Sequence, residues 1–268
     1  MLKDITLGQF FPGNSVVHRL DPRTKLILLL LYIVALFTAG GIVSYALCFA
    51  FLAASIAISH IPLKSILRGM KPLVMILIFT GVLNIFFTKG ERVLLHVWVI
   101  TVTVEGILRA VMMMSRILML VTGTFLLTYT TSPISLTDAL ESLLGPLKKL
   151  HVPVHELSMM MCIALRFIPT LIEETDKIMS AQKARGADFE TGKLLDRVKA
   201  LIPVLVPLFI SAFRRASELA TAMESRCYQG GEGRTKMKLL RYKARDYYAF
   251  ALGVALLAAV IGAIQFGL

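Results

Sequence analysis

Charged residues are scarce in this sequence of 268 residues, since Asp, Glu, Lys and Arg make up only 17% of it while hydrophobic residues make up 56%. A soluble domain usually carries about 25% charged residues, so this composition is typical of a polytopic membrane protein. Cysteine is also rare, and Cys48, Cys162 and Cys227 are far apart. Such spacing excludes a disulfide framework and suits free thiols in a reducing compartment.

Acidic residues are fewer than basic ones, which gives a formal net charge of +12. Much of the positive charge flanks apolar stretches, where it indicates membrane topology, and we therefore expect no nucleic-acid partner. We expect no signal peptide at the N-terminus, because Asp4 comes early and the first apolar run starts only after Asp21–Lys25.

Motifs for catalysis or metal binding are incomplete. His155-Glu156 begins like a zinc-protease motif, but Met159 stands where the second histidine ligand is required. Pro153 separates His151 from His155, and no third ligand is nearby. The segment 186–194 has the wrong glycine spacing and no Ser or Thr after Lys193 for a phosphate loop. We expect no catalytic residue, no metal and no cofactor.

Long apolar runs predict about five transmembrane helices, since a span needs roughly 20 apolar residues and sometimes only ~17. The candidate spans are 25–39, 42–59, 71–88, 105–130 and 246–266. The connecting loop 60–71 contains three basic residues and no acid, so it is expected to be cytosolic. This places the N-terminus and the segment 131–245 on the cytosolic side as well.

Two apolar segments carry additional sequence patterns. The β-branched stretch 93–104 predicts an outer-face hairpin or an interfacial segment anchored by Trp98, with part of an extra span as the alternative. In the last span, alanines recur every fourth residue at 251, 255, 259 and 263. Small residues at this spacing predict a helix-packing face.

The segment 131–245 is more polar, because it holds 18 of the 29 Lys and Arg residues and 12 of the 17 acids. Its periodicity predicts a short helix at 135–150 and two long helices, from Pro153 to Arg185 and over 193–227. Prolines at 169, 203 and 207 should bend the long helices. We expect the two to cross at the inner membrane surface.

The predicted fold class is therefore an all-α polytopic membrane protein with a cytosolic or interfacial coupling domain. Its domains would be 1–130 with four transmembrane helices, 131–245 as the coupling domain, and 246–268 with the last span. The expected location is the cell membrane, with multiple passes.

Two tripeptides, Ala184-Arg185-Gly186 and Ser225-Arg226-Cys227, stand at the ends of the two long helices. In each, a small residue precedes an arginine, and glycine follows at Gly186 or at Gly230-Gly231. One arginine at a helix end is common because it suits the helix dipole. A matched pair predicts that the two helix ends project together from the protein and that their guanidinium groups bind carboxylates in two partners.

Four other arginines are candidates for a structural or coupling role. Arg116 lies deep in a span, where a charge is costly and therefore marks a candidate functional site, or is held by an ion pair or by backbone carbonyls. Arg166, Arg214 and Arg215 interrupt apolar stripes, and we expect them to pair across the two long helices with acids such as Glu224.

Several motifs together resemble the transmembrane T component of energy-coupling factor (ECF) transporters over almost the whole chain. The segments that carry the resemblance are Gly8–Phe10, Pro12–Ser15, His18–Lys25, Thr130–Pro133, Ala164–Pro169, Ala181–Gly186, Ala222–Tyr228 and Gly233–Thr235. Ser225 departs from the family pattern, in which alanine is more usual, but both residues are small.

The resemblance implies a non-catalytic scaffold between two ECF ATPase subunits and a substrate-binding S component, of which several could be interchangeable. Membrane lipid is the other expected partner, and the implied activity is uptake of vitamins or other micronutrients. It also implies that Arg185 and Arg226 dock in grooves of the ATPases.

Other functions stay open at this stage. A dedicated cobalt, nickel or biotin importer would carry the same motifs. A polytopic membrane enzyme would need clustered acids or histidines, and Glu173-Glu174-Thr175-Asp176 is spread around its helix. A secondary carrier would show inverted repeats or broken helices, and none is evident.

Overall fold

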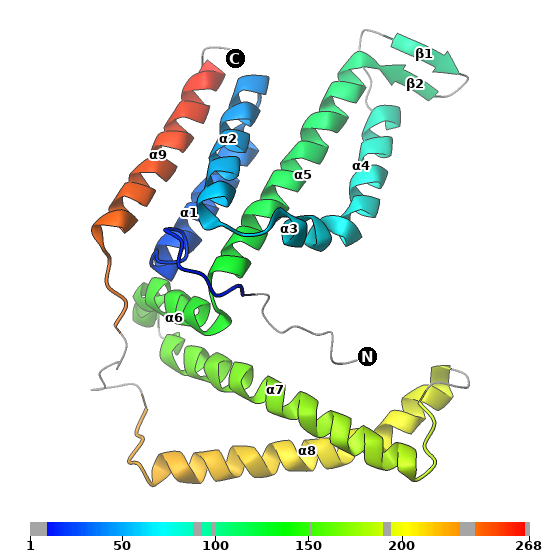
Figure 1. Cartoon of the computed structure of the whole chain (residues 1–268), viewed down its shortest axis with the longest axis vertical. Coiled ribbons are helices and arrows are strands. Elements are labelled where there is room, and N and C mark those ends of the chain that lie inside the picture. Colours follow the sequence, from blue (N-terminus) through cyan, green and yellow to red (C-terminus); the bar gives the residue numbers. More distant parts are fainter. Residues whose placement is uncertain are drawn as a thin grey trace. The chain divides into compact units, whose positions relative to one another are not determined.

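The computed structural model describes residues 10–87, 93–97, 100–150, 152–189, 194–230 and 239–265. Its elements are α1 (Pro22–Thr38), α2 (Ile42–Ser59), α3 (Leu63–Met70), α4 (Val74–Phe87), β1 (Val93–Val97), β2 (Ile100–Thr103), α5 (Val104–Thr130), α6 (Pro133–Leu143), α7 (Val154–Ala184), α8 (Leu194–Glu224) and α9 (Ala244–Gln265) (Figure 1). The described residues form two compact units, one from Gly8–Ala139 with Leu240–Leu268 and one from Leu140–Leu239.

Six helical segments in the described residues are long and apolar enough to span a membrane: α2, α3 with α4, α5, α7, α8 and α9. The expected all-α polytopic membrane fold is confirmed. With 17 residues, α1 is shorter than all six, yet it is within the range that can span a bilayer, ~17–25 residues. The assignment of α7 and α8 to the cytosolic surface stays a prediction, because both have the length and composition of spans.

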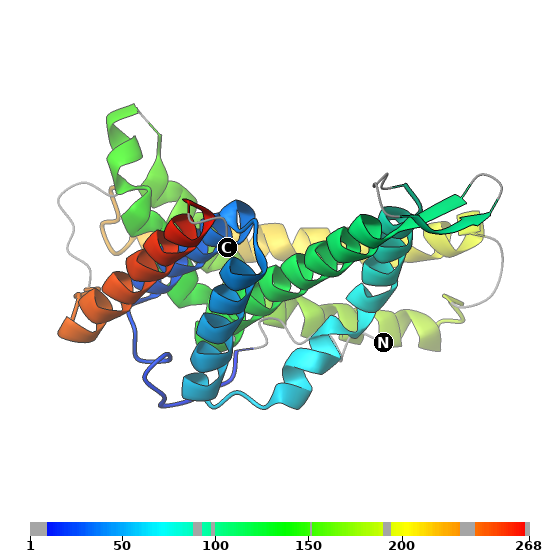
Figure 2. The ribbon, with the colours of Figure 1, turned by 90° about the horizontal axis from the view of Figure 1, so that it is seen from above.

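The first unit is a bundle in which α1, α2, α5 and α9 pack side by side (Figures 1 and 2). Its core is apolar and is centred on Tyr32 and Leu36 from α1, Cys48 from α2, Met119 from α5 and Val260 from α9. These residues are buried because the four helices turn one face each toward the others. The outward faces expose many large apolar side chains, as expected for helices surrounded by lipid.

Close contact between α1 and α9 depends on Gly253, because a Cβ at this position would lie 2.5 Å from Cδ2 of Leu28. The buried face of α9 carries Gly253, Leu256 and Val260. The predicted packing face was wrong, since Ala251, Ala255 and Ala259 are exposed. Their spacing of four shifts by about 40° per turn against the 3.6-residue period, so spacing alone does not identify the buried side.

The described residues 93–97 and 100–103 form two antiparallel strands, with β1 paired to β2 through Val97↔Ile100, His96↔Thr101 and Leu95↔Val102. The pairing agrees with the hairpin alternative for this stretch. Its place at the outer face stays a prediction, and Trp98 lies outside the described residues. The segment 60–71 is not a loop but mostly α3. Ile66 and Met70 pack with Tyr129, which gives this basic segment an apolar face and makes a helix favourable.

The segment His18–Lys25 ties three parts of the bundle together. The Lys25 ammonium donates to the carbonyl oxygens of Thr130 (2.8 Å) and His18 (3.3 Å) and to Oγ1 of Thr131 (3.2 Å). The backbone N–H of Asp21 donates to Oδ1 of Asp246 at 2.8 Å. The start of α1 is thereby joined both to the end of α5 and to the start of α9.

The second unit is built mainly from α7 and α8, which cross and pack against each other (Figure 1). The predicted helix 135–150 is divided into α6 and a 3-10 turn, Gly145–Leu150. Glu141 of α6 links that helix to α7. Its carboxylate accepts a hydrogen bond from Ser158 Oγ at 2.9 Å and lies 3.1 Å from His155 Nδ1. No group of His, Cys, Asp and Glu in the described residues could hold a metal ion.

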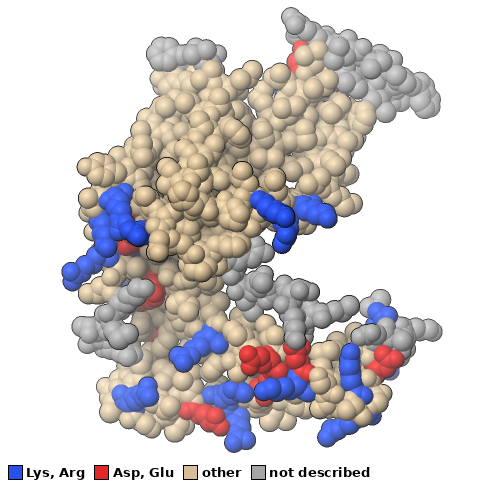
Figure 3. Space-filling model, in the orientation of Figure 1, with Lys and Arg blue, Asp and Glu red and all other residues tan. Residues whose placement is uncertain are grey.

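Charge differs between the two units (Figure 3). The visible face of the bundle is mostly uncharged, and its Lys and Arg side chains gather where α3 lies and where α9 begins. The unit of α7 and α8 shows basic and acidic side chains along its length. Lys and Arg at one end of a bundle are typical of the cytosolic side.

Candidate functional site

The C-terminus of α7 ends in a Schellman motif at Arg185 and Gly186. Arg185 is the C-cap. The N–H of Gly186 donates to the Lys183 carbonyl at 3.0 Å, and the N–H of Ala187 donates to the Gln182 carbonyl at 3.0 Å. Gly186 has φ +89°, a left-handed conformation that glycine adopts without steric cost. Gly186 therefore ends α7 at a defined residue, and Arg185 is the C-cap directly before it.

The C-terminus of α8 is closed in the same way. The N–H of Cys227 donates to the Glu224 carbonyl at 2.8 Å, and the N–H of Tyr228 donates to the Met223 carbonyl at 3.0 Å. Cys227 has φ +57°. By this pattern Arg226 is the C-cap and Cys227 takes the left-handed position after it.

The two tripeptides are thus equivalent residue by residue. Ala184 and Ser225 form the last helical position, Arg185 and Arg226 the C-cap, and Gly186 and Cys227 the left-handed residue. The glycine pair that follows Arg226 in the sequence does not take this left-handed position, which Cys227 occupies. The predicted helix 193–227 also extends too far, because Arg226 and Cys227 belong to the turn that closes α8.

All six residues of the tripeptides are exposed. Neither guanidinium group of Arg185 and Arg226 has a hydrogen bond or ion pair within the described part of the chain. Each stands at the negative end of a long helix, which favours its positive charge but leaves its five N–H donors available. The two helix ends therefore present matched guanidinium groups that have no partner within the described residues.

The crossing of α7 and α8 is held by polar contacts. Glu174 of α7 binds two side chains of α8, Ser211 through a short hydrogen bond and Arg215 at 2.9 Å. The Gln182 side-chain amide donates to the Pro203 carbonyl at 3.4 Å. Pro207 has no N–H to satisfy this carbonyl four residues earlier, so Gln182 replaces the missing helical donor.

The other predicted arginines differ in their contacts. Within the described residues, Arg215 is the one of the three expected arginines that pairs between α7 and α8. Arg214 pairs within its own helix with Glu218 at 3.0 Å, because the i,i+4 spacing brings them together on the exposed face. Arg166 and Glu224 are exposed and have no side-chain partner within the described residues.

Arg116 of α5 lies inside the bundle and is held by a backbone carbonyl. Its guanidinium donates to Ala39 at 3.1 Å and lies over the rings of Phe37 (5.7 Å) and Tyr45 (5.6 Å). This arrangement joins α5 to the turn between α1 and α2. A carbonyl and two aromatic faces stabilise a cation without an acid, which fits the structural role weighed for this residue.

Comparison with known proteins shows which family this chain belongs to. The family model of the cobalt transport protein CbiQ matches residues 13–237, a range that includes both arginine tripeptides. The chain is 52% identical to the energy-coupling factor transporter transmembrane protein EcfT of Ruminiclostridium cellulolyticum, over 97% of each chain. This chain belongs to the EcfT family.

Other EcfT proteins match over a similar length. The EcfT protein of Thermosediminibacter oceani is 55% identical over 93% of this chain and 94% of its own, and that of Bacillus subtilis is 48% identical over 92% and 93%. Membership of this family and the apolar helices make the protein a multi-pass component of the cell membrane and of an ECF transporter.

Proposed function

We propose that this EcfT-family chain is the energy-coupling subunit that links two ATPase subunits to a substrate-binding S component. Arg185 and Arg226 dock in the two ATPases, one arginine in each, and each guanidinium binds a carboxylate in a groove. The observation that carries this proposal is the equivalence of two exposed helix ends whose arginines have no partner within the described residues. ATP hydrolysis belongs to the partners.

The contact with the S component is proposed for the apolar faces of the long helices. The face of α8 exposes large hydrophobic side chains along most of its length: Leu195, Val198, Leu201, Ile202, Leu205, Val206, Phe209, Ile210 and Phe213. Such a surface is larger than a soluble protein usually leaves uncovered. Because apolar packing is non-directional, the same face can accept several different S components.

The proposed coupling between the ATPases and the S component depends on the crossed arrangement of α7 and α8. Closure of the ATPases on ATP binding brings the ends of α7 and α8 together, and the helices pass this motion to the S component, which tilts and releases its cargo inward. The crossing is fixed by Glu174, Arg215 and Gln182, so the helices move as a connected pair. The proposed cargo is a vitamin or another micronutrient, and a dedicated cobalt, nickel or biotin importer is the alternative.

The test is co-purification with a candidate pair of ATPases after expression in one cell. Arg185→Glu together with Arg226→Glu should abolish co-purification, because loss of a buried charged hydrogen bond costs about 2 kcal/mol or more, roughly thirtyfold in affinity, at each site. Arg197→Glu is the matched control, since Arg197 is another exposed arginine of α8. Retention of both ATPases by the folded double variant would reject docking through these arginines.

A further inference from the structure

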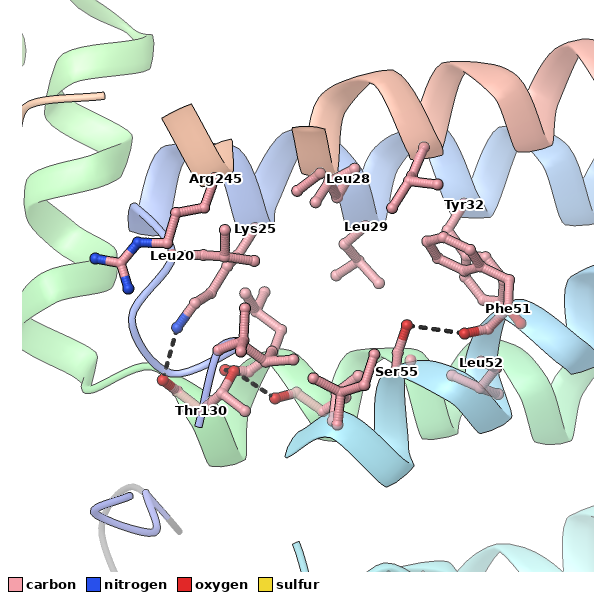
Figure 4. Close-up of a pocket in the computed structure, with 18 of the residues that line it drawn as sticks. Leu20, Lys25, Leu28, Leu29, Tyr32, Phe51, Leu52, Ser55, Thr130 and Arg245 are labelled. Carbon is pink, nitrogen blue, oxygen red and sulfur yellow. Dashed lines mark hydrogen bonds between the residues drawn. The ribbon is translucent and has the colours of Figure 1, made fainter. Parts of the chain in front are cut away.

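The bundle of α1, α2, α5 and α9 encloses a pocket of about 420 Å³. This volume is within the range of small-molecule sites, ~300–1,000 Å³. Most of its wall is apolar, and it includes Leu28, Leu29 and Tyr32 of α1 and Phe51 and Leu52 of α2 (Figure 4), with further apolar residues from α5 and α9. The wall suits a hydrocarbon chain and offers few hydrogen-bonding groups to a polar ligand.

The rim of the pocket is apolar and exposed. Tyr248 and Leu252 of α9 are 74% and 64% exposed, and Ile58 of α2 is 48% exposed. In a membrane protein such side chains face lipid, and a tyrosine near the start of a span is typical of the membrane interface. Because these lining residues are exposed, we infer that the pocket is open at the outer surface of the bundle, where lipid surrounds the helices.

One end of the pocket is positively charged. Lys25 and Arg245 both line it, and Figure 4 shows their nitrogen atoms at the same end, beyond the apolar side chains. The ammonium of Lys25 donates only to uncharged oxygens, those of His18, Thr130 and Thr131. No carboxylate binds either cation directly within the described residues.

The two nearby carboxylates are already occupied. Asp246 accepts from the backbone N–H groups of Asp21 and Lys243, both at 2.8 Å. Asp21 holds the Arg23 guanidinium at 3.1 Å. Arg245 has no hydrogen bond or ion pair within the part of the chain that the structure describes. Its guanidinium is available to an external anion.

We propose that this pocket binds an anionic phospholipid, with one acyl chain between α1, α2 and α9 and the phosphate on Arg245. A cationic end and an apolar wall that opens to the membrane fit the two parts of such a lipid. A basic residue near an anionic headgroup strengthens binding by about fivefold, which corresponds to ~1 kcal/mol. The lipid would connect α9 to α1 and α2 independently of the docking of any ATPase.

Photo-crosslinking of the full chain in nanodiscs tests this site. The probes are phosphatidylglycerol and phosphatidylcholine that carry a diazirine on one acyl chain, and labelled peptides are mapped by mass spectrometry. We expect phosphatidylglycerol to label the pocket-lining segments 28–32, 51–58 and 248–252 at least about fivefold more strongly than phosphatidylcholine. Equal labelling by the two lipids would overturn the proposal, because it would indicate ordinary surrounding lipid.

Variants separate the pocket from general attraction to the membrane. Arg245→Gln should lower labelling by phosphatidylglycerol about fivefold, Arg245→Lys should restore most of it, and Ala249→Leu should reduce labelling by both lipids, since Ala249 lines the pocket. Arg241→Gln removes the same charge from an exposed residue that does not line the pocket, so it should have no effect. Full labelling of Arg245→Gln, or an equal loss in Arg241→Gln, would contradict the proposal.

Discussion

Gly186 and Cys227 occupy the same position in two equivalent helix ends, each in a left-handed conformation one residue after an arginine. Only the glycine is suited to it, because a left-handed backbone costs other residues roughly 1–2 kcal/mol. The turn at the end of α8 therefore contains backbone strain at Cys227, whereas the turn at the end of α7 has none at Gly186. This difference can be measured.

Cys227→Gly should stabilise the end of α8. The gain is expected to be at most about 1 kcal/mol, since relief of the left-handed strain is partly offset by the greater freedom of glycine in the unfolded chain. Hydrogen exchange should show it as slower exchange of the N–H groups of residues 227 and 228, which donate to Glu224 and Met223. Faster exchange in the variant would mean that the cysteine side chain stabilises this turn.

Gly186→Ala should have the opposite sign and destabilise the end of α7 by about 1 kcal/mol. Gly145→Ala is the control, because Gly145 has no left-handed φ and a Cβ there would meet no atom within 4 Å. Equal effects of the two substitutions on hydrogen exchange would contradict the assigned role of Gly186.

The Gln182 side chain should contribute to the free energy of unfolding only while Pro207 is present. Gln182→Ala removes the donor to the Pro203 carbonyl, at an expected cost of about 0.5–1.5 kcal/mol. In a Pro207→Ala background the new N–H of residue 207 can take over this carbonyl, so the same change should cost close to nothing. A double-mutant cycle on thermal unfolding measures the coupling, and strict additivity would reject it.

Asp246→Asn should destabilise the bundle. Both carboxylate oxygens of the buried Asp246 accept backbone N–H groups, at 2.8 Å each. An amide NH₂ would face one of these donors, which leaves a buried N–H unsatisfied at about 1–3 kcal/mol. Thermal unfolding in detergent checks this, with Asp138→Asn as control, because Asp138 has no partner within the described residues. An unchanged melting temperature would show that the hydrogen bonds of Asp246 to the backbone N–H groups of Asp21 and Lys243 do not stabilise the bundle.

The segment before α1 should lose stability in acid. Burial lowers the pKa of His18 from its ordinary 6.5, and the nearby Lys25 acts in the same direction, although a hydrogen bond to the Phe11 carbonyl opposes them. The unfolded chain then binds the proton more readily, so the contribution of His18 is complete above pH 6.5 and is lost as the pH falls below it. The difference in stability between wild type and His18→Gln should therefore shrink in acid, and a constant difference would contradict this account.

Much of the fold could be predicted from the sequence because lipid imposes simple rules. Length and hydropathy were enough to place α2, α5 and α9 within about two residues. The break between the spans 25–39 and 42–59 and the paired strands before α5 also agree with the prediction. These features depend on local composition.

Features that depend on a specific partner were not predictable. The α9 face that packs inward is decided by the shape of α1 at Leu28, which the alanine repeat does not encode. Glu174 could have been expected to bind several arginines, and only the crossing of α7 and α8 selects Arg215 over Arg214. The left-handed conformation of Cys227 was hidden because a cysteine rarely takes this position, and only the equivalence to Gly186 at the backbone reveals it.

The proposed function requires two separate docking sites, one at the C-terminal end of α7 and one at that of α8. Native mass spectrometry of the complex can count the ATPase subunits bound to them. The wild-type chain should carry two ATPase subunits, Arg185→Glu or Arg226→Glu alone should each leave a population with one, and the double variant should carry none. Two ATPases bound to the double variant, with the chain still folded, would contradict the account and leave the arginines of α7 and α8 without a role in docking.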